Sequence, residues 1–284
     1  MKRSFALFLT LSFGSVFLYS QNIATSFDWS LFDGLHVIQT NKTYTLVNQI
    51  EQLAKTSAIQ YDICTRSDGY HKIVESRNVL IQLVNGVAAT EGDQELLRYQ
   101  IIPLNLLAYY DGTYFKWSGY DNVRSYLSQN FSSIGLKYDD INSILEEDAV
   151  TQWLLWKLLV EKWNNNYIYN GKQETGSSNY VIRFGSKLPN EICLSENAEY
   201  TIEGDISKIK YHGEASDNEI KRCFPAQSRQ CIIAYIIDID LVTDSKTLIP
   251  YEYKFTKTIG IKSSDGTITY HIEESYYSFS RMAF

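Results

Sequence analysis

The chain begins with an apolar run that carries no charge. Two cations, Lys2 and Arg3, precede the stretch from Phe5 to Tyr19, which has no charged residue. A cationic end, an apolar segment of about fifteen residues and a small residue near its end are typical of a secretory signal. Ser20 is the small residue here, so we expect residues 1–20 to be a signal peptide or an N-terminal membrane anchor.

Three interpretations of this start remain open. The leader is cleaved after Ser20, or it is retained as an anchor, or it is a buried strand or helix of a cytoplasmic protein. The uncharged stretch continues to Phe27, which supports an anchor, although a full span needs roughly 20 apolar residues. With Lys2 and Arg3 inside, the rest of the chain faces outward in the first two cases. We therefore predict a secreted or extracytoplasmic protein that contacts a membrane only through an uncleaved N-terminus.

The next part of the chain shows apolar residues at three- and four-residue steps. This period predicts helices over about Tyr44–Ala58, from about Glu75 to Glu91, and over about Asp140–Trp163, with a short helix near Gln94–Tyr99. Ile59–Thr65 alternates like a strand and ends at the turn Ser67-Asp68-Gly69. Residues 21–170 are therefore predicted to be mostly helical.

The strongest hairpin signal lies inside this region. Leu104–Tyr110 and Thr113–Trp117 are rich in β-forming residues and flank the pair Asp111-Gly112. An Asp-Gly pair between two such runs is typical of a tight β-hairpin.

The last third of the chain is predicted to form a β-sheet. Gly171–Asn179 is polar and rich in Gly and Ser, which predicts a loop or a soft domain boundary, and residues 180–284 are predicted to form an antiparallel β region. The expected strands are Tyr180–Phe184, Tyr200–Glu203, Ile206–Tyr211, Cys231–Val242, Tyr251–Phe255, Thr258–Lys262 and Thr267–Glu273. The last two are joined through Ser264-Asp265-Gly266, which predicts a second hairpin. The predicted class is α+β, with a helical N-terminal half carrying a β-hairpin, followed by a mostly antiparallel β-sheet.

Charge narrows the range of partners. The net charge is −7, and it becomes −9 without Lys2 and Arg3, with 24 basic against 33 acidic residues. An acidic chain without a basic stripe argues against nucleic acid as a partner and against adsorption of the folded part to anionic lipid. At 44% apolar residues the chain can bury a core.

Four cysteines permit two disulfides in an exported chain. Cys223 and Cys231 flank a short loop and are the expected pair, which leaves Cys64 with Cys193. The alternative is four buried thiols, which behave as small apolar side chains. The spacing does not resemble a zinc site, and we expect no metal or other cofactor.

The sequence shows no recognisable catalytic constellation. The histidines are isolated, and there is no Gly-x-Ser-x-Gly or phosphate-binding glycine loop. A hydrolase remains an alternative, because acid pairs meet only in three dimensions. Its candidate carboxylates are Glu146, Asp148, Asp238, Asp240 and Glu252.

Three tryptophans share one predicted helix. Trp153, Trp156 and Trp163 are spaced by three and seven residues, so two or three of them can line one side. Core packing is one explanation. The other is a surface for a partner protein or a carbohydrate.

The N-terminal part resembles a known group of proteins. An apolar start, an early amphipathic segment, a helical stretch and the hairpin sequence Ile102–Phe115, with Ile-Pro before the first strand, make Met1 to Trp117 similar to uncharacterised membrane-anchored proteins that accompany Tad-type pilus or conjugation machinery. The resemblance implies a component of an extracytoplasmic apparatus rather than an enzyme.

These observations favour a non-enzymatic extracytoplasmic protein that acts through protein–protein contacts with other extracytoplasmic proteins, in a pilus or transfer apparatus. The alternatives are a secreted glycan- or peptide-binding module, which a cluster of exposed aromatic residues would favour, and a secreted hydrolase with a carboxylate site.

Overall fold

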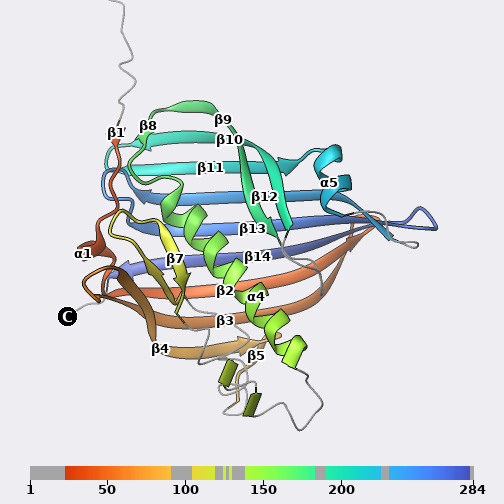
Figure 1. Cartoon of the computed structure of the whole chain (residues 1–284), viewed down its shortest axis with the longest axis horizontal. Helices are drawn as coiled ribbons and strands as arrows, with labels where there is room; N and C mark the ends of the chain where they lie inside the picture. Colours follow the sequence, from red (N-terminus) through yellow and green to blue (C-terminus); the bar gives the residue numbers. More distant parts are fainter. Residues whose placement is uncertain are drawn as a thin grey trace, which may run out of the picture.

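The computed structural model describes residues 23–90, 104–118, 124–125, 128–129, 138–182, 190–224 and 230–281. The described chain is mostly β, and its main feature is a twelve-stranded sheet in which every pairing is antiparallel (Figure 1). The leader and the short helix expected at Gln94–Tyr99 lie outside the described residues.

Two meanders build the sheet. The first consists of β2 (Leu35–Val47), β3 (Ile50–Ser67) and β4 (Lys72–Val84), and β4 also pairs with β5 (Val87–Ala88) and β6 (Leu106–Ala108). The second contains β9 (Gly171–Ile182), β10 (Asn190–Glu203), β11 (Ile206–Ala215), β12 (Gln230–Asp244), β13 (Pro250–Ser263) and β14 (Ile268–Arg281). The last strand, β14, pairs with β2 over thirteen residues from Thr269 to Arg281 and so joins the two meanders.

One helix lies across one face of this sheet. Helix α4 (Tyr138–Trp156) continues into a π-helical turn, η2 (Lys157–Glu161), and crosses the strands in front of the sheet (Figure 1). The edge strands are β7 (Tyr114–Trp117) and β9, and both contact α4. We call the side that α4 covers the helix face and the opposite side the outer face.

The alternation along the strands assigns the two faces. In β11 every second residue is buried, from Ser207 to Ala215, while the residues between them are exposed except for the half-buried His212. Because side chains alternate across a strand, the helix face collects the apolar residues and the outer face stays polar. Smaller elements close the ends: β1 (Ile23–Ala24) with β8 (Tyr167–Ile168), α1 (Trp29–Phe32) and α5 (Asp217–Cys223).

The predicted helical N-terminal half is wrong. Tyr44–Ala58, predicted as helix, is the end of β2, a two-residue turn and the start of β3. The turn residues Asn48 and Gln49 have φ of 51° and 66°, the left-handed values that a tight hairpin turn requires. Apolar residues on both sides of the turn recur at helical spacing, and Glu51–Lys55 are good helix formers, so the pairing of β2 with β3 overrides local propensity here.

Two further segments, one predicted as a helix and one as a loop, are also strands. The helix expected from Glu75 is β4, and the loop expected at Gly171–Asn179 is most of β9. The polar residues of β9 form a strand because their backbone pairs with β10. The described residues therefore form a large antiparallel sheet with one long helix, and the predicted boundary near residue 170 falls immediately before an edge strand of that sheet.

Other predictions are confirmed. The hairpins at Asp111-Gly112 and at Asp265-Gly266 are present as β6–β7 and β13–β14, and both glycines have φ of +88°. The helix expected over Asp140–Trp163 is α4 with η2.

Within the described residues, no helix has the length and apolar character needed to span a membrane.

Candidate functional site: an aromatic surface beside an apolar groove

The turn between β3 and β4 is fixed by one carboxylate. Asp68 Oδ1 accepts hydrogen bonds from the backbone N–H groups of Tyr70 at 2.8 Å and His71 at 2.6 Å, and its other oxygen lies 3.2 Å from His71 Nδ1. Gly69 supplies the positive φ of +94° that the turn requires. The backbone bonds from His71 and Tyr70 lower the pKa of Asp68 to about 2. The side chains of Tyr70 and His71 are thus presented from an ordered turn.

The β6–β7 hairpin is held next to this turn. Trp156 Nε1 donates to the carbonyl oxygen of Gly112 at 2.7 Å, and the side-chain amide of Asn164 donates to the carbonyl of Asp111. A Cβ at Gly112 would lie 2.7 Å from Asn164 Nδ2, so glycine permits this close approach. The hydroxyls of Tyr110 and Ser67 hydrogen-bond each other and connect the hairpin to the turn.

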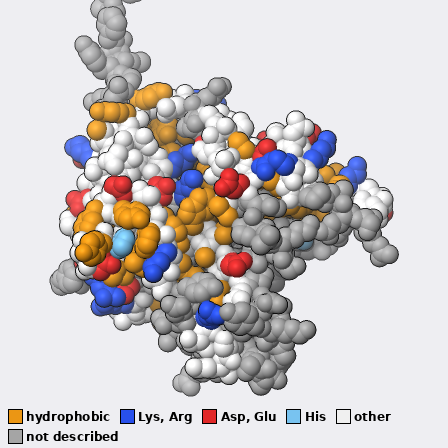
Figure 2. Space-filling model, viewed as in Figure 1, with side chains coloured by type: hydrophobic (Ala, Val, Ile, Leu, Met, Phe, Trp, Pro, Cys, Tyr) orange, Lys and Arg blue, Asp and Glu red, His pale blue; other side chains and the backbone are white. Residues whose placement is uncertain are grey.

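Together the turn and the hairpin expose a cluster of aromatic rings. His71 stacks on Phe115 with ring centroids 4.5 Å apart, and Tyr109 lies 5.3 Å from both rings. Tyr70 is 81% exposed, and Tyr109, Tyr110 and Phe115 each expose about two fifths or more of their surface. We call these five residues the aromatic surface; Figure 2 shows hydrophobic side chains gathered around a histidine on this face. Exposed apolar side chains scattered singly are ordinary, but a contiguous group marks an interaction site.

An apolar groove of about 620 Å³ continues from the aromatic surface. It is lined by Leu107, Tyr114, Phe115, Lys116, Trp117, Ser118, Ala149, Val150, Trp153 and Val181. Phe115 belongs to both features, and Figure 2 shows hydrophobic side chains continuing from the aromatic cluster toward the middle of the face. The two features therefore form one contact region made of the β3–β4 turn, the β6–β7 hairpin and α4.

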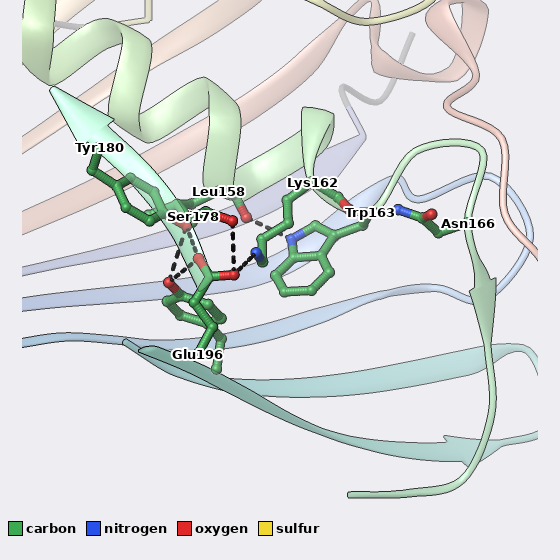
Figure 3. Close-up of polar contacts among 8 residues, drawn as sticks. Leu158, Lys162, Trp163, Asn166, Ser178, Tyr180 and Glu196 are labelled. Atoms are coloured by element: carbon green, nitrogen blue, oxygen red, sulfur yellow. Dashed lines mark hydrogen bonds and ion pairs between the residues drawn. The ribbon is translucent and has the colours of Figure 1, made fainter. Parts of the chain in front are cut away.

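Behind this region a buried carboxylate connects the helix end to the sheet (Figure 3). Glu196 on β10 is 1% exposed, and its Oε2 lies 2.7 Å from Lys162 Nζ and accepts from Ser178 Oγ at 3.0 Å. Its Oε1 accepts from the hydroxyls of Tyr180 and, at 2.8 Å, Tyr211.

This network keeps Glu196 ionised. Burial raises the pKa of the carboxyl, but the hydrogen bonds from Lys162, Tyr180 and Tyr211 and the positive charge of Lys162 outweigh burial, so the pKa is lowered. Burial also raises the pKa of the Tyr180 and Tyr211 hydroxyls far above their ordinary range. Both oxygens of Glu196 are hydrogen-bonded, and the residue does not line the groove. Its side chain is therefore suited to holding η2 against strands β9–β11 and not to proton transfer.

The three predicted tryptophans have different surroundings. Trp156 and Trp163 are buried in the core, where Trp156 stacks on Trp29 and Trp163 donates its Nε1–H to the carbonyl of Leu158 at 2.6 Å. Trp153 is half-buried and lines the groove. A surface made of all three is therefore not present, because Trp156 packs against α1 and its flank, whereas Trp163, which follows η2, packs against Tyr200 and Tyr211 of the sheet.

Neither predicted disulfide is formed. All four cysteines lie in the described part of the chain, and all four are thiols. Cys223 on α5 donates to the carbonyl of Glu191 at 3.2 Å, and Cys231 on β12 donates to that of Lys262 at 3.7 Å. Cys64 on β3 and Cys193 on β10 are on strands that are not neighbours in the sheet.

The candidate carboxylates of a hydrolase are divided between the two sides of the sheet. Asp238 and Asp240 line a hollow on the outer face, where Asp238 pairs with His212 at 2.7 Å, and Glu252 is exposed on β13. Glu146 lies on α4, on the other side of the sheet, and the side chain of Asp148 lies outside the described residues. Among the described residues no group of three or more His, Cys, Asp or Glu is placed to hold a metal ion.

Sequence reasoning missed Glu196 and Lys162, although a signal was present. Ile192, Leu194, Ala198 and Tyr200 alternate on the buried side of β10, and Glu196 occupies the same register. A charged residue in the buried register of a strand requires a partner, which Lys162 supplies.

The acid range provides a test of the β3–β4 turn. The folded pKa of Asp68, about 2, is below its ordinary 3.8, so its contribution to the turn is full above pH 3.8 and is lost as the pH falls through 2. We expect the backbone amide signals of Tyr70 and His71 to titrate in NMR spectra between about pH 4 and 2, and Asp68→Asn to abolish this titration. Signals that do not change below pH 4 would contradict the assignment.

Comparisons with known proteins do not assign the chain to a class. No family model matches the chain, and no curated protein matches it. Among solved structures, a loop-deletion mutant of OmpT, an outer membrane protein of Vibrio cholerae, is similar at 9% identity over 86% of this chain and 100% of that chain, with a TM-score of 0.16. A likeness at this level carries no argument about fold or function.

Proposed function

We propose that this chain is an extracytoplasmic, non-enzymatic protein that acts through protein–protein contacts made by the aromatic surface. The observation that carries the proposal is the contact of the His71, Tyr109 and Phe115 rings at the surface, with the exposed Tyr70 and Tyr110 next to His71 and Tyr109 in the chain. Tyrosine and phenylalanine are enriched in protein interfaces because they bury much apolar area for few rotatable bonds. The export of the chain is proposed from the leader sequence, and its similarity to proteins of Tad-type machinery leads us to propose a pilus or transfer apparatus as its setting.

The two loops that present the exposed rings are ordered by hydrogen bonds, which favours a binding role for these rings. Hydrogen bonds of Asp68, Trp156 and Asn164 fix the two loops that present them. A surface ordered before binding loses less conformational entropy when a partner is bound.

A glycan is the second candidate ligand. Exposed rings provide stacking faces for sugars, and the hydroxyls of Tyr109 and Tyr110 add hydrogen-bonding groups at their edges. The hydrolase alternative has less support, because Asp238 and Asp240 share one exposed polar environment, whereas an acid and a base need different ones.

Substitution of a ring in the aromatic surface tests the proposal. A photo-crosslinking amino acid at position 70 of the full chain, expressed in its native cells, is expected to capture a protein partner identifiable by mass spectrometry. With that partner purified, Tyr109→Ala is expected to weaken binding by about fivefold to thirtyfold, since truncating a tyrosine in an interface typically costs ~1–2 kcal/mol.

The matched control is Tyr251→Ala on β13, which lies outside the aromatic surface and the groove lining and is 42% exposed, against 41% for Tyr109. This control is expected to leave the affinity unchanged. Equal effects of the two substitutions, or an array experiment in which only glycans bind, would overturn the proposed protein contact.

A further inference from the structure

The groove lies between the two edges of the sheet. Its lining residues come from β6, β7 and Ser118 on one side, from α4 in the middle, and from Val181 of the other edge strand, β9, on the far side. Strand edges carry unpaired backbone groups, and an extended peptide can pair with such an edge while its alternate side chains fill neighbouring pockets.

A cationic side chain lines the groove, although the protein is acidic. Lys116 is the one charged residue among the ten described residues that line the groove, and the chain as a whole carries a net charge of −7. In the described part of the chain Lys116 has no carboxylate within ion-pairing distance, and its ammonium lies 5.9 Å from the Phe115 ring. The carboxylate of Glu161, which approaches β7, accepts from the backbone N–H of Tyr114 at 3.0 Å.

We propose that this groove seats an extended segment of the protein partner, with apolar side chains against Trp153 and Val150 and an acidic side chain paired with Lys116. The inference rests on the proposed function, because Phe115 makes the groove continuous with the aromatic surface. An apolar groove with an unneutralised cation favours a ligand that is both apolar and anionic, and an open groove along a strand edge favours a peptide.

A display library of short linear peptides, selected on the full-length protein, provides the probe. We expect the enriched peptides to combine apolar residues with at least one Asp or Glu. Their affinity, measured by fluorescence anisotropy, is expected to fall about tenfold or more in Lys116→Glu and in Val150→Asp, and to weaken with salt. The control Lys210→Glu reverses an exposed charge on the outer face and is expected to change nothing.

Several outcomes would overturn the inference. These are a selection without enriched peptides, enriched peptides that lack acidic residues, affinities unchanged by Lys116→Glu, or displacement of the peptides by a long-chain fatty acid. If Tyr109→Ala weakens the native partner while Lys116→Glu does not, the groove assignment fails and the proposed function stands. The reverse pattern removes the aromatic surface from the function and leaves the groove.

Discussion

Replacing Glu196 by alanine is expected to lower the free energy of unfolding by roughly 3–5 kcal/mol, the range for removing one partner of a buried ion pair. The variant leaves the Lys162 ammonium, which is 13% exposed at its side chain, without its carboxylate. It also leaves the hydroxyls of Tyr180 and Tyr211 without their shared acceptor. The two hydroxyls still lie 3.0 Å apart and can bond each other, but one of their O–H donors and the ammonium lose the acceptor that burial requires.

Chemical denaturation at neutral pH measures this effect, and an exposed ion pair provides the control. Lys208 and Glu203 lie 2.8 Å apart with side chains about half exposed, so Lys208→Ala is expected to cost at most ~1 kcal/mol. A loss below about 1 kcal/mol for Glu196→Ala would show that the network does not fasten η2 to the sheet.

The pH dependence gives a second measurement on the same carboxylate. Because the folded pKa of Glu196 is lowered from 4.5, its contribution to stability is present above pH 4.5 and is lost as the pH falls through the folded value. Wild type is therefore expected to lose more stability below pH 4.5 than Glu196→Gln, which has no proton to bind at this position.

The sequence predicted local turns better than long strands. Asp111-Gly112 and Asp265-Gly266 were recognised because their chemistry resides in adjacent residues. The β2–β3 hairpin was missed, because the second half of β2, from Asn41 to Val47, has no clean alternation of buried and exposed residues. The pairing of β14 with β2 joins residues more than 200 positions apart and leaves no local signal.

The parts of the candidate site could be predicted from the sequence, but their contact could not. The turn at Ser67-Asp68-Gly69 and the β6–β7 hairpin were each predicted, but their meeting was not. It depends on the pairing of Lys72–Val74 with Leu106–Ala108, which brings His71 onto Phe115. A binding surface assembled from two loops therefore becomes visible only when the sheet between them is known.

Trp156 was predicted as part of a binding surface, but it is buried beneath the aromatic surface and stabilises it. Trp156 is fully buried, stacks on Trp29 at 5.7 Å and packs edge-on against Phe27 and Phe32. Its indole N–H also holds the β6–β7 hairpin through the carbonyl of Gly112. Trp156→Ala is expected to cost ~3–5 kcal/mol in the free energy of unfolding, because a large cavity opens and a buried hydrogen bond is lost.

Two comparisons separate the packing role of Trp156 from its hydrogen bond. Trp156→Phe keeps an aromatic ring without the N–H donor, so it is expected to lose less stability than Trp156→Ala while still loosening the hairpin, seen as faster amide hydrogen exchange at Tyr114 and Phe115. The control Tyr167→Ala removes a ring that is 69% exposed and is expected to stay within about 0.5 kcal/mol of wild type. If Trp156→Ala matched this control, the aromatic surface would not depend on the core beneath it, and its order would have to arise from the Asp68 turn alone.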